Sequence, residues 1–443
     1  MSEETSALKL PADRPGPTYK WWVVGMLWFI CFFNYADRMA INAVSTVLKK
    51  EYHFDNEQFG MIASAFMYVY ALSAPFAGQI GDRFPRKLLI LGGLFVWSAV
   101  TGATAYCRTL WQFVFVRATE GLGETFYFPA TMSLVADYHT KKTRSLAMGL
   151  HQTSVYAGTI GGTTLAGVLA EHYGWTSPFM VFGLCGIGLG LLLAVFLREP
   201  ARNEAERFEL GSIEHETPPP AIPIRQFLGE LVRTPTAMLL ILAFFGANSV
   251  GLVFMTWMPN YLSEEFGMAL AKAAFVSTFY QQIASVAGSV LGGALADRAR
   301  RRLPGGRILT QSLGAFFGIP FIYLAGMTTR SQELIVYLTL IGLAKGIYDA
   351  NIWASMYDVV HPSRRATMLG LANMIGWFGA GCGTYGFGLA TTRWKVSMGQ
   401  ALSSTAVIYA VVAVLLLIAG TLCAPRDIRR AEATPDAAEV IAD

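Results

Sequence analysis

Charged side chains in the middle of long apolar segments are the residues of this sequence best placed to do chemistry. Seven ionisable residues have such positions: Asp37, Arg38, Arg117, Glu120, Glu124, Lys345 and Asp349. An unpaired charge at the centre of a bilayer costs about 2.5–3.5 kcal/mol on insertion scales. We therefore expect these side chains to pair with one another or to face a water-filled cavity.

Five of the seven are predicted to lie close together. At a rise of about 1.5 Å per residue, Asp37 lies ~6 Å beyond the middle of the segment 20–46. The segment 111–136 runs back from that side, which puts Glu124 near its middle. Arg117 and Glu120 lie further out, and the i, i+3, i+7 spacing of the three residues places them on one helix face. Asp37, Arg38, Arg117 and Glu120 then share a layer in the outer half of the membrane, with Glu124 below it.

The residue types suggest distinct roles in proton and anion chemistry. Arginine stays charged, whereas a carboxyl group in apolar surroundings can take up a proton. Asp37 and Glu124 are therefore the predicted protonation sites, and Arg117 adjusts whichever carboxylate it pairs with. Arg38 is predicted to bind a substrate carboxylate through two hydrogen bonds. Glu120 is either a third titrating group or a salt partner, and the whole cluster can alternatively be a structural ion-pair network.

A second charged pair lies far along the chain, where Lys345 and Asp349 are spaced i, i+4. One interpretation is an internal pair that neutralises itself. The other is that Lys345 adds positive potential for an anionic substrate and Asp349 modulates it. Other polar residues in apolar segments are Tyr35, Tyr70, His151, Gln152, Tyr280, Gln281, Asn351 and Asn373. The predicted substrate contacts are Arg38, Tyr35, Tyr70, Gln152, Lys345 and Asn373.

Composition indicates the elements that must position these residues. The chain has 443 residues, of which 53% are hydrophobic and only 14% charged, against about 25% charged in soluble domains. A helix needs ~20 apolar residues to span a bilayer. We predict twelve spans, at 20–46, 57–80, 88–107, 111–136, 145–170, 176–197, 236–260, 271–296, 308–328, 333–357, 366–390 and 397–422. The predicted fold is an all-α membrane protein with twelve transmembrane helices in two six-helix bundles.

A long polar connection divides the spans into two sets of six. It contains mixed charges and the run Pro218–Pro220, as a soluble linker does. The predicted divisions are a cytoplasmic N-terminal segment (1–19), a first bundle (20–197), a linker (198–235), a second bundle (236–422) and a cytoplasmic tail (423–443). Loops on the side of the termini hold 24 Lys and Arg and the other loops hold seven. The positive-inside rule therefore places both termini in the cytoplasm.

The two halves share short sequence motifs. The stretch Gly78–Arg83 after the second span has a weaker copy at Gly293–Arg298 after the eighth. The pattern Asp137…Arg144…Gly149-Leu150 recurs as Asp358…Arg365…Gly370-Leu371, with every residue offset by 221. The same offset places Lys345 at the position of Glu124. Two copies of a six-span unit are typical of secondary transporters whose binding site lies between the halves.

The stretch Gly78–Lys87 closely resembles the cytoplasmic loop motif of the major facilitator superfamily, although Pro85 stands where glycine is usual. The resemblance covers nearly the whole chain. It implies that this loop acts as a gate latch, so the predicted gating residues are Gly78, Asp82, Arg83 and Arg86, with Asp297 and Arg298 in the second copy. Asn34–Arg38 and the pattern Arg117…Gly121-Leu122-Gly123-Glu124 resemble the anion:cation symporter branch.

That branch carries sugar acids and other organic anions with protons, so the resemblance assigns proton coupling to Asp37, Glu124 and Arg117. Tyr35 and Tyr70 match aromatic positions of the sugar-acid carriers. The spinster-like branch, which carries lysolipids, shares the Asp-Arg pair, the later arginine and the Gly-x-Gly-Glu pattern. The motifs do not separate the two branches.

The leading prediction is proton-coupled symport of an organic anion, a sugar acid or small carboxylate, by alternating access. Spinster-like lysophospholipid transport and drug/proton antiport are the alternatives. An enzyme is disfavoured because the Gly-x-Gly runs lie in spans and no metal-ligand set occurs. We expect no cofactor besides protons, no nucleic-acid partner and a monomer in a bacterial inner membrane. Its partners would be a small anionic substrate or lysolipid, protons and the lipid bilayer.

Overall fold

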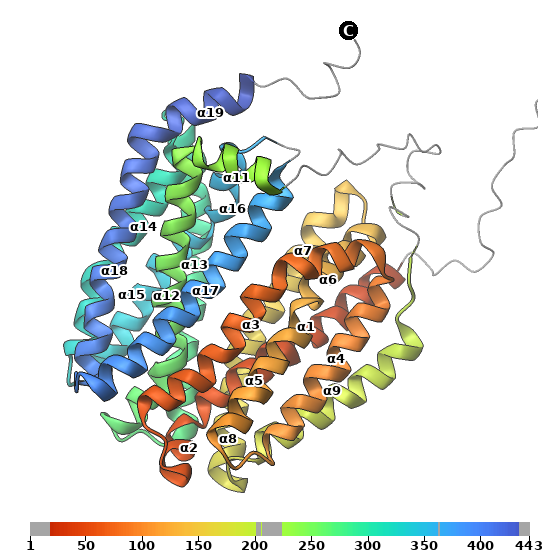
Figure 1. The fold of residues 1–443 in the computed structure, drawn as a ribbon, viewed down its shortest axis with the longest axis vertical. Coiled ribbons are helices and arrows are strands. Elements are labelled where there is room, and N and C mark those ends of the chain that lie inside the picture. The colour runs from red at the N-terminus through yellow and green to blue at the C-terminus, as the bar shows by residue number, and fades with distance from the viewer. Residues whose placement is uncertain (1–17, 201–204, 206–223, 362–363, 434–443) are drawn as a thin grey trace, which may run out of the picture.

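The computed structural model describes residues 18–200, 205, 224–361 and 364–433. In this part of the chain every regular element is helical. Two bundles stand side by side, and α3 of the first packs along α17 of the second (Figure 1). The all-α, two-bundle fold expected from the sequence is confirmed.

The first bundle contains six helical segments, as predicted. They are α1 (Tyr19–Ala43), α3 (Asn56–Arg83), α4 (Arg86–Thr104), α5 with α6 (Leu110–Thr125, Tyr127–Tyr138), α7 with η1 and α8 (Lys141–Ala157, Gly158–Gly162, Thr163–Tyr173), and α9 (Ser177–Phe196). A short helix, α2 (Ser45–Tyr52), connects the first two segments.

The second bundle repeats this order with six further segments. They are α12 (Pro235–Glu264), α13 (Leu270–Arg300), α14 (Gly306–Met327), α15 with α16 (Ser331–Asp349, Ile352–Asp358), α17 (Arg365–Arg393), and α18 with η3 and α19 (Met398–Ile418, Ala419–Cys423, Ala424–Ala433). The fourth segment of each bundle is broken, after Thr125 in the first and after Asp349 in the second. Glu124 and Lys345 lie just before these breaks, so the repeat extends to the backbone around the predicted charges.

Seven of the described helices are long and apolar enough, by length and composition alone, to cross a membrane. The segments that fall short are α1, α5–α6, α7–α8, α13 and α17. Two of these, α1 and α5, hold the buried charges. The others pack against the opposite bundle, α8 on α13 and α17 on α3. These helices are less apolar because they have surfaces that face protein. Placing a polar side chain there costs less free energy than placing it against lipid.

Parts of the predicted linker and tail are helices docked on the second bundle. In α11 (Ile224–Val232), Phe227 is buried and Glu230 forms an ion pair with Arg364. In α19, the Asp427 carboxylate accepts hydrogen bonds from the backbone N–H of Thr236 at 2.9 Å and from its hydroxyl at 2.6 Å. A carboxylate at this place satisfies free N–H groups at the start of α12 and favours its helix dipole.

An ion pair recurs in both bundles with the same offset of 221 residues. Arg86 lies 2.6 Å from Asp137 in the first bundle, and Arg307 lies 2.9 Å from Asp358 in the second. Each pair joins the start of the third segment to the end of the fourth. The Glu199 carboxylate also accepts hydrogen bonds from the backbone N–H of Arg86 at 3.0 Å and of Lys87 at 2.6 Å. These contacts stabilise each bundle as a unit.

Two neighbouring glycines of α13 provide a test of the packing. A Cβ at Gly292 would lie 2.6 Å from the Cα of Ile347 in α15, whereas a Cβ at Gly293 meets no atom within 4 Å. Overpacking of this kind costs about 1–3 kcal/mol. We expect Gly292→Ala to lower the midpoint of thermal unfolding of the detergent-solubilised protein. Gly293→Ala is the control and should leave it unchanged or raise it slightly. Equal midpoints for the two variants would contradict the close contact of α13 with α15.

Candidate functional site

Helices α1 and α5 bring together five buried ionisable side chains, here called the charge cluster: Asp37, Arg38, Arg117, Glu120 and Glu124. Each is at most 5% exposed. Asp37 and Arg38 follow one another in α1, and the other three share one face of α5, as their spacing predicts. The structure therefore places in one region the residues that depth and helical spacing bring together.

Arg38 pairs with Glu124. The Nε and one terminal nitrogen of Arg38 donate hydrogen bonds to Oε2 of Glu124, at 3.1 and 2.5 Å. The same terminal nitrogen lies 3.4 Å from Oδ1 of Asn34. The other oxygen of Glu124 has no hydrogen-bond partner in the described part of the chain. The group predicted to bind a substrate carboxylate thus already binds a carboxylate of the protein.

Arg117 has a different partner. One of its terminal nitrogens donates to Oε2 of Glu120 at 2.5 Å, three residues further along α5. The other donates to the backbone carbonyl of Arg38 at 3.4 Å, which connects the two pairs. Both carboxyl oxygens of Asp37 are buried and, among the described residues, have no hydrogen-bond partner. The charge cluster is therefore two ion pairs beside one unpartnered carboxyl group.

The charge cluster has an uneven number of acids and bases. Two guanidinium groups face three carboxyl groups, so its net charge is −1 with every carboxyl ionised and zero with one proton bound. An uncompensated charge buried in a low-dielectric interior is costly. The arrangement can therefore bind and release protons while its pairs remain in place.

Aromatic rings surround the Arg38 guanidinium. Its central carbon lies 4.7 Å from the ring centroids of Tyr35 and Phe66, 5.0 Å from Trp377 and 5.4 Å from Tyr70. These distances lie within the range of cation–π attraction. We call these four rings the aromatic cage. Phe66 also lies 4.9 Å from the Arg117 guanidinium, so it separates the two cations.

Trp377 belongs to α17, so the second bundle contributes a wall of the aromatic cage. Sequence reasoning did not select this residue because it carries no charge and lies in no recognised motif. One signal was present: tryptophans of membrane helices concentrate at the membrane surfaces, whereas Trp377 is in the middle of its span. A tryptophan at that depth points to an internal contact.

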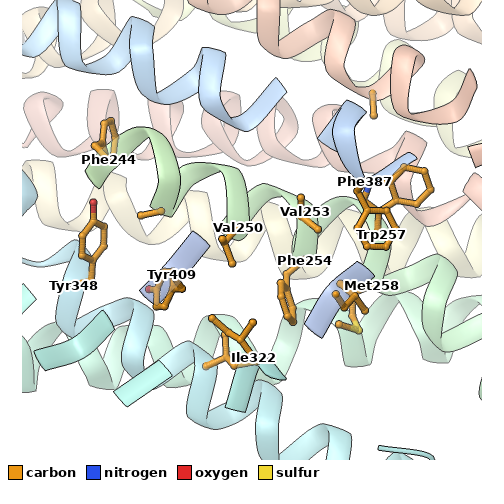
Figure 2. Close-up of a cluster of buried hydrophobic side chains, with 14 of the residues drawn as sticks. Phe244, Val250, Val253, Phe254, Trp257, Met258, Ile322, Tyr348, Phe387 and Tyr409 are labelled. Carbon is orange, nitrogen blue, oxygen red and sulfur yellow. The ribbon is translucent and has the colours of Figure 1, made fainter. Parts of the chain in front are cut away.

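Lys345 and Asp349 form the predicted i, i+4 ion pair. Their side chains are 28% and 31% exposed, so the pair is not sealed in the core. It lines a cavity of about 100 Å³ inside the second bundle. Val250, Phe254, Ile322, Tyr348 and Tyr409 also line this cavity, and Figure 2 shows them gathered around α12. The internal pair is present, and it also faces space that a ligand can enter.

The predicted gating residues lie at the ends of helices. Gly78 and Asp82 lie in the last turns of α3, and Arg83 and Arg298 are exposed. Arg86 pairs inside the first bundle, and Asp297 lies 3.7 Å from Arg307 of its own bundle. Two further residues were predicted to contact the substrate. Gln152 is exposed on α7, and Asn373 is half-buried on α17 in the other bundle. Their role in substrate binding stays a prediction.

Ion pairs between the bundles lie at the end of the molecule marked by α2, here called the far face. Lys49 reaches Glu264 at 2.9 Å, and Arg393 reaches Glu57 at 2.6 Å. The hydroxyl of Tyr385 also donates to Glu57 at 3.1 Å. Helices α11 and α19 lie at the opposite end (Figure 1). These pairs hold the bundles together at the far face.

Comparisons with known proteins show the family and the fold of the chain. The family model described as Major Facilitator Superfamily matches residues 27–384 and 253–441. The probable galactarate/D-glucarate transporter GudP of Escherichia coli is 24% identical over 99% of this chain and 100% of its own length. Protein spinster homolog 1 of Mus musculus is 26% identical over 78% of this chain and 68% of its own length.

A solved structure has the same fold. It is a bacterial homolog of the human lysosomal transporter Spinster in an inward-facing, unoccupied conformation. It superposes with a TM-score of 0.75 and 21% identity, covering 94% of this chain and 99% of the other.

The pairing of Arg38 with Glu124 predicts an asymmetry between two single substitutions. Removing one partner of a buried pair costs about 3–5 kcal/mol when the other charge stays. The carboxyl group left by Arg38→Met can take up a proton, whereas the guanidinium left by Glu124→Met cannot lose one. We expect Glu124→Met to be the more destabilising in thermal unfolding, and the double variant to recover most of the loss. Equal single effects that simply add in the double variant would contradict the pair.

Proposed function

Because the chain belongs to the Major Facilitator Superfamily, whose members are multi-pass membrane transporters and not enzymes, we propose that it carries an organic anion together with protons by alternating access. One observation carries the proposal: Asp37 is a buried carboxyl group that has no hydrogen-bond partner among the described residues and lies beside two arginine–carboxylate pairs. The cluster is electrically neutral only with one proton bound, and Asp37 is the group without a compensating cation. Asp37 is therefore the first proposed proton site.

The second proposed proton site is Glu124, because its carboxylate accepts the hydrogen bonds of the Arg38 guanidinium that would bind the substrate. A proton on Glu124 weakens its hold on Arg38, and a substrate carboxylate can take its place through the same two donors. The anion then replaces one negative charge with another, so the cluster stays neutral. This exchange of partners requires one proton for each carboxylate that binds.

Charge balance also explains why neither species would move alone. With Asp37 protonated, an anion at Arg38 with Glu124 still ionised would give the buried cluster a net charge of −1. A proton on Glu124 without an anion would leave Arg38 uncompensated, with a net charge of +1. Both states are disfavoured in a low-dielectric interior. In this proposal, symport follows from electrostatics. Arg117 and Glu120 stay a neutral pair throughout, so Glu120 acts as a salt partner and not as a third titrating group.

Alternating access would come from rocking of one bundle on the other. The ion pairs at the far face close that side, and the aromatic cage contributed by both bundles closes around Arg38. We place the termini in the cytoplasm on the basis of loop charge, which makes the far face external and the direction inward. We propose that the protein acts as a monomer in the inner membrane of a bacterium.

A sugar acid is the substrate class that we favour. The name of GudP refers to galactarate and D-glucarate, which are dicarboxylates rich in hydroxyl groups, and the single guanidinium of Arg38 favours a relative with one carboxylate. Arg38 offers the donors for the carboxylate, and tyrosines of the aromatic cage lie around it. Three further residues that the sequence predicts to contact the substrate provide polar groups on other helices: Gln152, Lys345 and Asn373.

The substrate class is tested with purified protein in liposomes under an inward proton gradient. We expect uptake of D-gluconate above that of empty liposomes, and this uptake should be lost when a protonophore collapses the proton gradient. Uptake of lysophosphatidylcholine without uptake of any acid would replace organic-anion symport with lysolipid transport.

The proton sites are tested in the same liposomes. Asp37→Asn and Glu124→Gln should each reduce proton-driven accumulation at least tenfold, because the first removes a proton site and the second fixes Glu124 in a neutral form. Exchange of labelled for unlabelled substrate needs no net proton movement and should remain. Glu333→Gln is the control, a carboxyl at the start of α15 outside the charge cluster, and should keep accumulation. Full accumulation in both Asp37→Asn and Glu124→Gln would sink the assignment of the proton sites.

A further inference from the structure

The cavity beside Lys345 and Asp349 shares a wall with the aromatic cage around Arg38. Leu252 of α12 lines the cavity and also packs against the buried cluster of Phe66, Met67, Tyr70 and Ala380, against which Trp377 packs as well. Asn248, another lining residue, approaches so close to Gly376 that a Cβ there would lie 2.5 Å from its amide nitrogen. Gly376 directly precedes Trp377, which covers Arg38. The cavity and Arg38 thus lie on the two sides of a layer of side chains that includes Leu252 and Trp377, and a ligand that reaches both sites has to displace these side chains.

The polar groups of the cavity are mixed donors and acceptors. They are Asn248, Gln281, Lys345, Tyr348, Asp349 and Tyr409, from α12, α13, α15 and α18. Amide and phenol groups both donate and accept, an ammonium group donates and a carboxylate accepts. Lys345 and Asp349 neutralise each other, so the cavity presents a strong donor and a strong acceptor with no net charge.

A second carboxylate would fit this cavity poorly, because Asp349 repels it and already satisfies Lys345. A hydroxyl group fits well, because it can accept from Lys345 and donate to Asp349 at once. Apolar neighbours such as Leu252, Phe254 and Ile322 suit the C–H faces between the hydroxyls of such a chain. The volume of about 100 Å³ leaves room for a short hydroxylated segment and too little for a lipid tail.

We propose that this cavity is the subsite for the hydroxylated part of the transported acid, with the Lys345–Asp349 pair and Asn248 hydrogen-bonding its hydroxyl groups. The inference rests on the proposed function, since Arg38 holds the carboxylate. Each bundle then recognises a different end of the same molecule: the first binds the acid group and the second the hydroxyls. The breaks of the fourth segments, after Thr125 and after Asp349, lie close in sequence to both sets of groups.

The test measures dissociation constants for two acids with the full-length reconstituted protein. D-gluconate carries the hydroxyls, and hexanoate is an acid of the same chain length without them. The variant Lys345→Met/Asp349→Leu removes the polar pair and leaves no unpaired charge. We expect it to weaken D-gluconate about tenfold, the value of roughly one well-made hydrogen bond, and to leave hexanoate within about twofold.

Two further variants keep the result unambiguous. Asn248→Leu removes a polar lining group without touching a charge, and should also weaken D-gluconate selectively if the first variant fails to fold. Arg330→Met/Glu333→Leu is the matched control, an exposed ion pair at the other end of α15, and should change neither constant.

Equal losses for both acids, or none for either, would overturn the subsite. So would binding of hexanoate by the unmodified protein as tightly as D-gluconate, or binding of hexanoate alone. In each of these cases proton-driven uptake of an acid would leave the proposed function standing. If no acid is driven into liposomes by protons, the proposed function itself fails, and that result is seen before any variant is made.

Discussion

The buried charges between α1 and α5 must balance, and the rest of the molecule is arranged around that requirement. Two guanidinium groups and three carboxyl groups lie in a region with almost no exposure. In a low dielectric each uncompensated charge costs several kcal/mol, so the numbers of protons and anions in the cluster cannot change independently. Arg38 with Glu124 and Arg117 with Glu120 use all the cations, and Asp37 is left over. Coupling of a proton to an anion is the functional consequence that we propose.

The aromatic cage connects this electrostatic condition to the arrangement of the bundles. Three of its rings come from the first bundle, and Trp377 comes from the second. Replacing Glu124 by a substrate at Arg38 therefore changes what the second bundle contacts. Each bundle is internally fastened by its own copy of an arginine–aspartate pair, Arg86 with Asp137 and Arg307 with Asp358. In the mechanism that we propose, the two bundles, joined at the far face, rock as units when the contacts at Arg38 change.

Much of this arrangement followed from the sequence, because hydropathy and helical geometry fix the depth and face of a residue in a span. The two bundles and the meeting of Asp37 and Arg38 with Arg117, Glu120 and Glu124 were predicted on that basis. The pairing of Arg38 with Glu124 was not predicted, because helical depth placed Arg38 one layer above Glu124. The long side chain of Arg38 crosses that distance. Trp377 and the cavity at Lys345 arise from packing between distant segments, which spacing along one helix does not encode. The helices α11 and α19 were also missed, because short amphipathic segments resemble linkers and tails in composition.

The protonation of Asp37 is measured most directly by infrared spectroscopy of the purified protein, through the carbonyl stretch of a protonated carboxyl group. The charge balance proposed for the cluster predicts such a band at neutral pH in the unmodified protein. It should be absent in Asp37→Asn, and lost also in Glu120→Gln, where two carboxyl groups remain for two guanidinium groups and the cluster is neutral without a bound proton. A band that persists undiminished in Asp37→Asn, or its absence from the unmodified protein, would contradict the central claim that Asp37 holds the proton that neutralises the cluster.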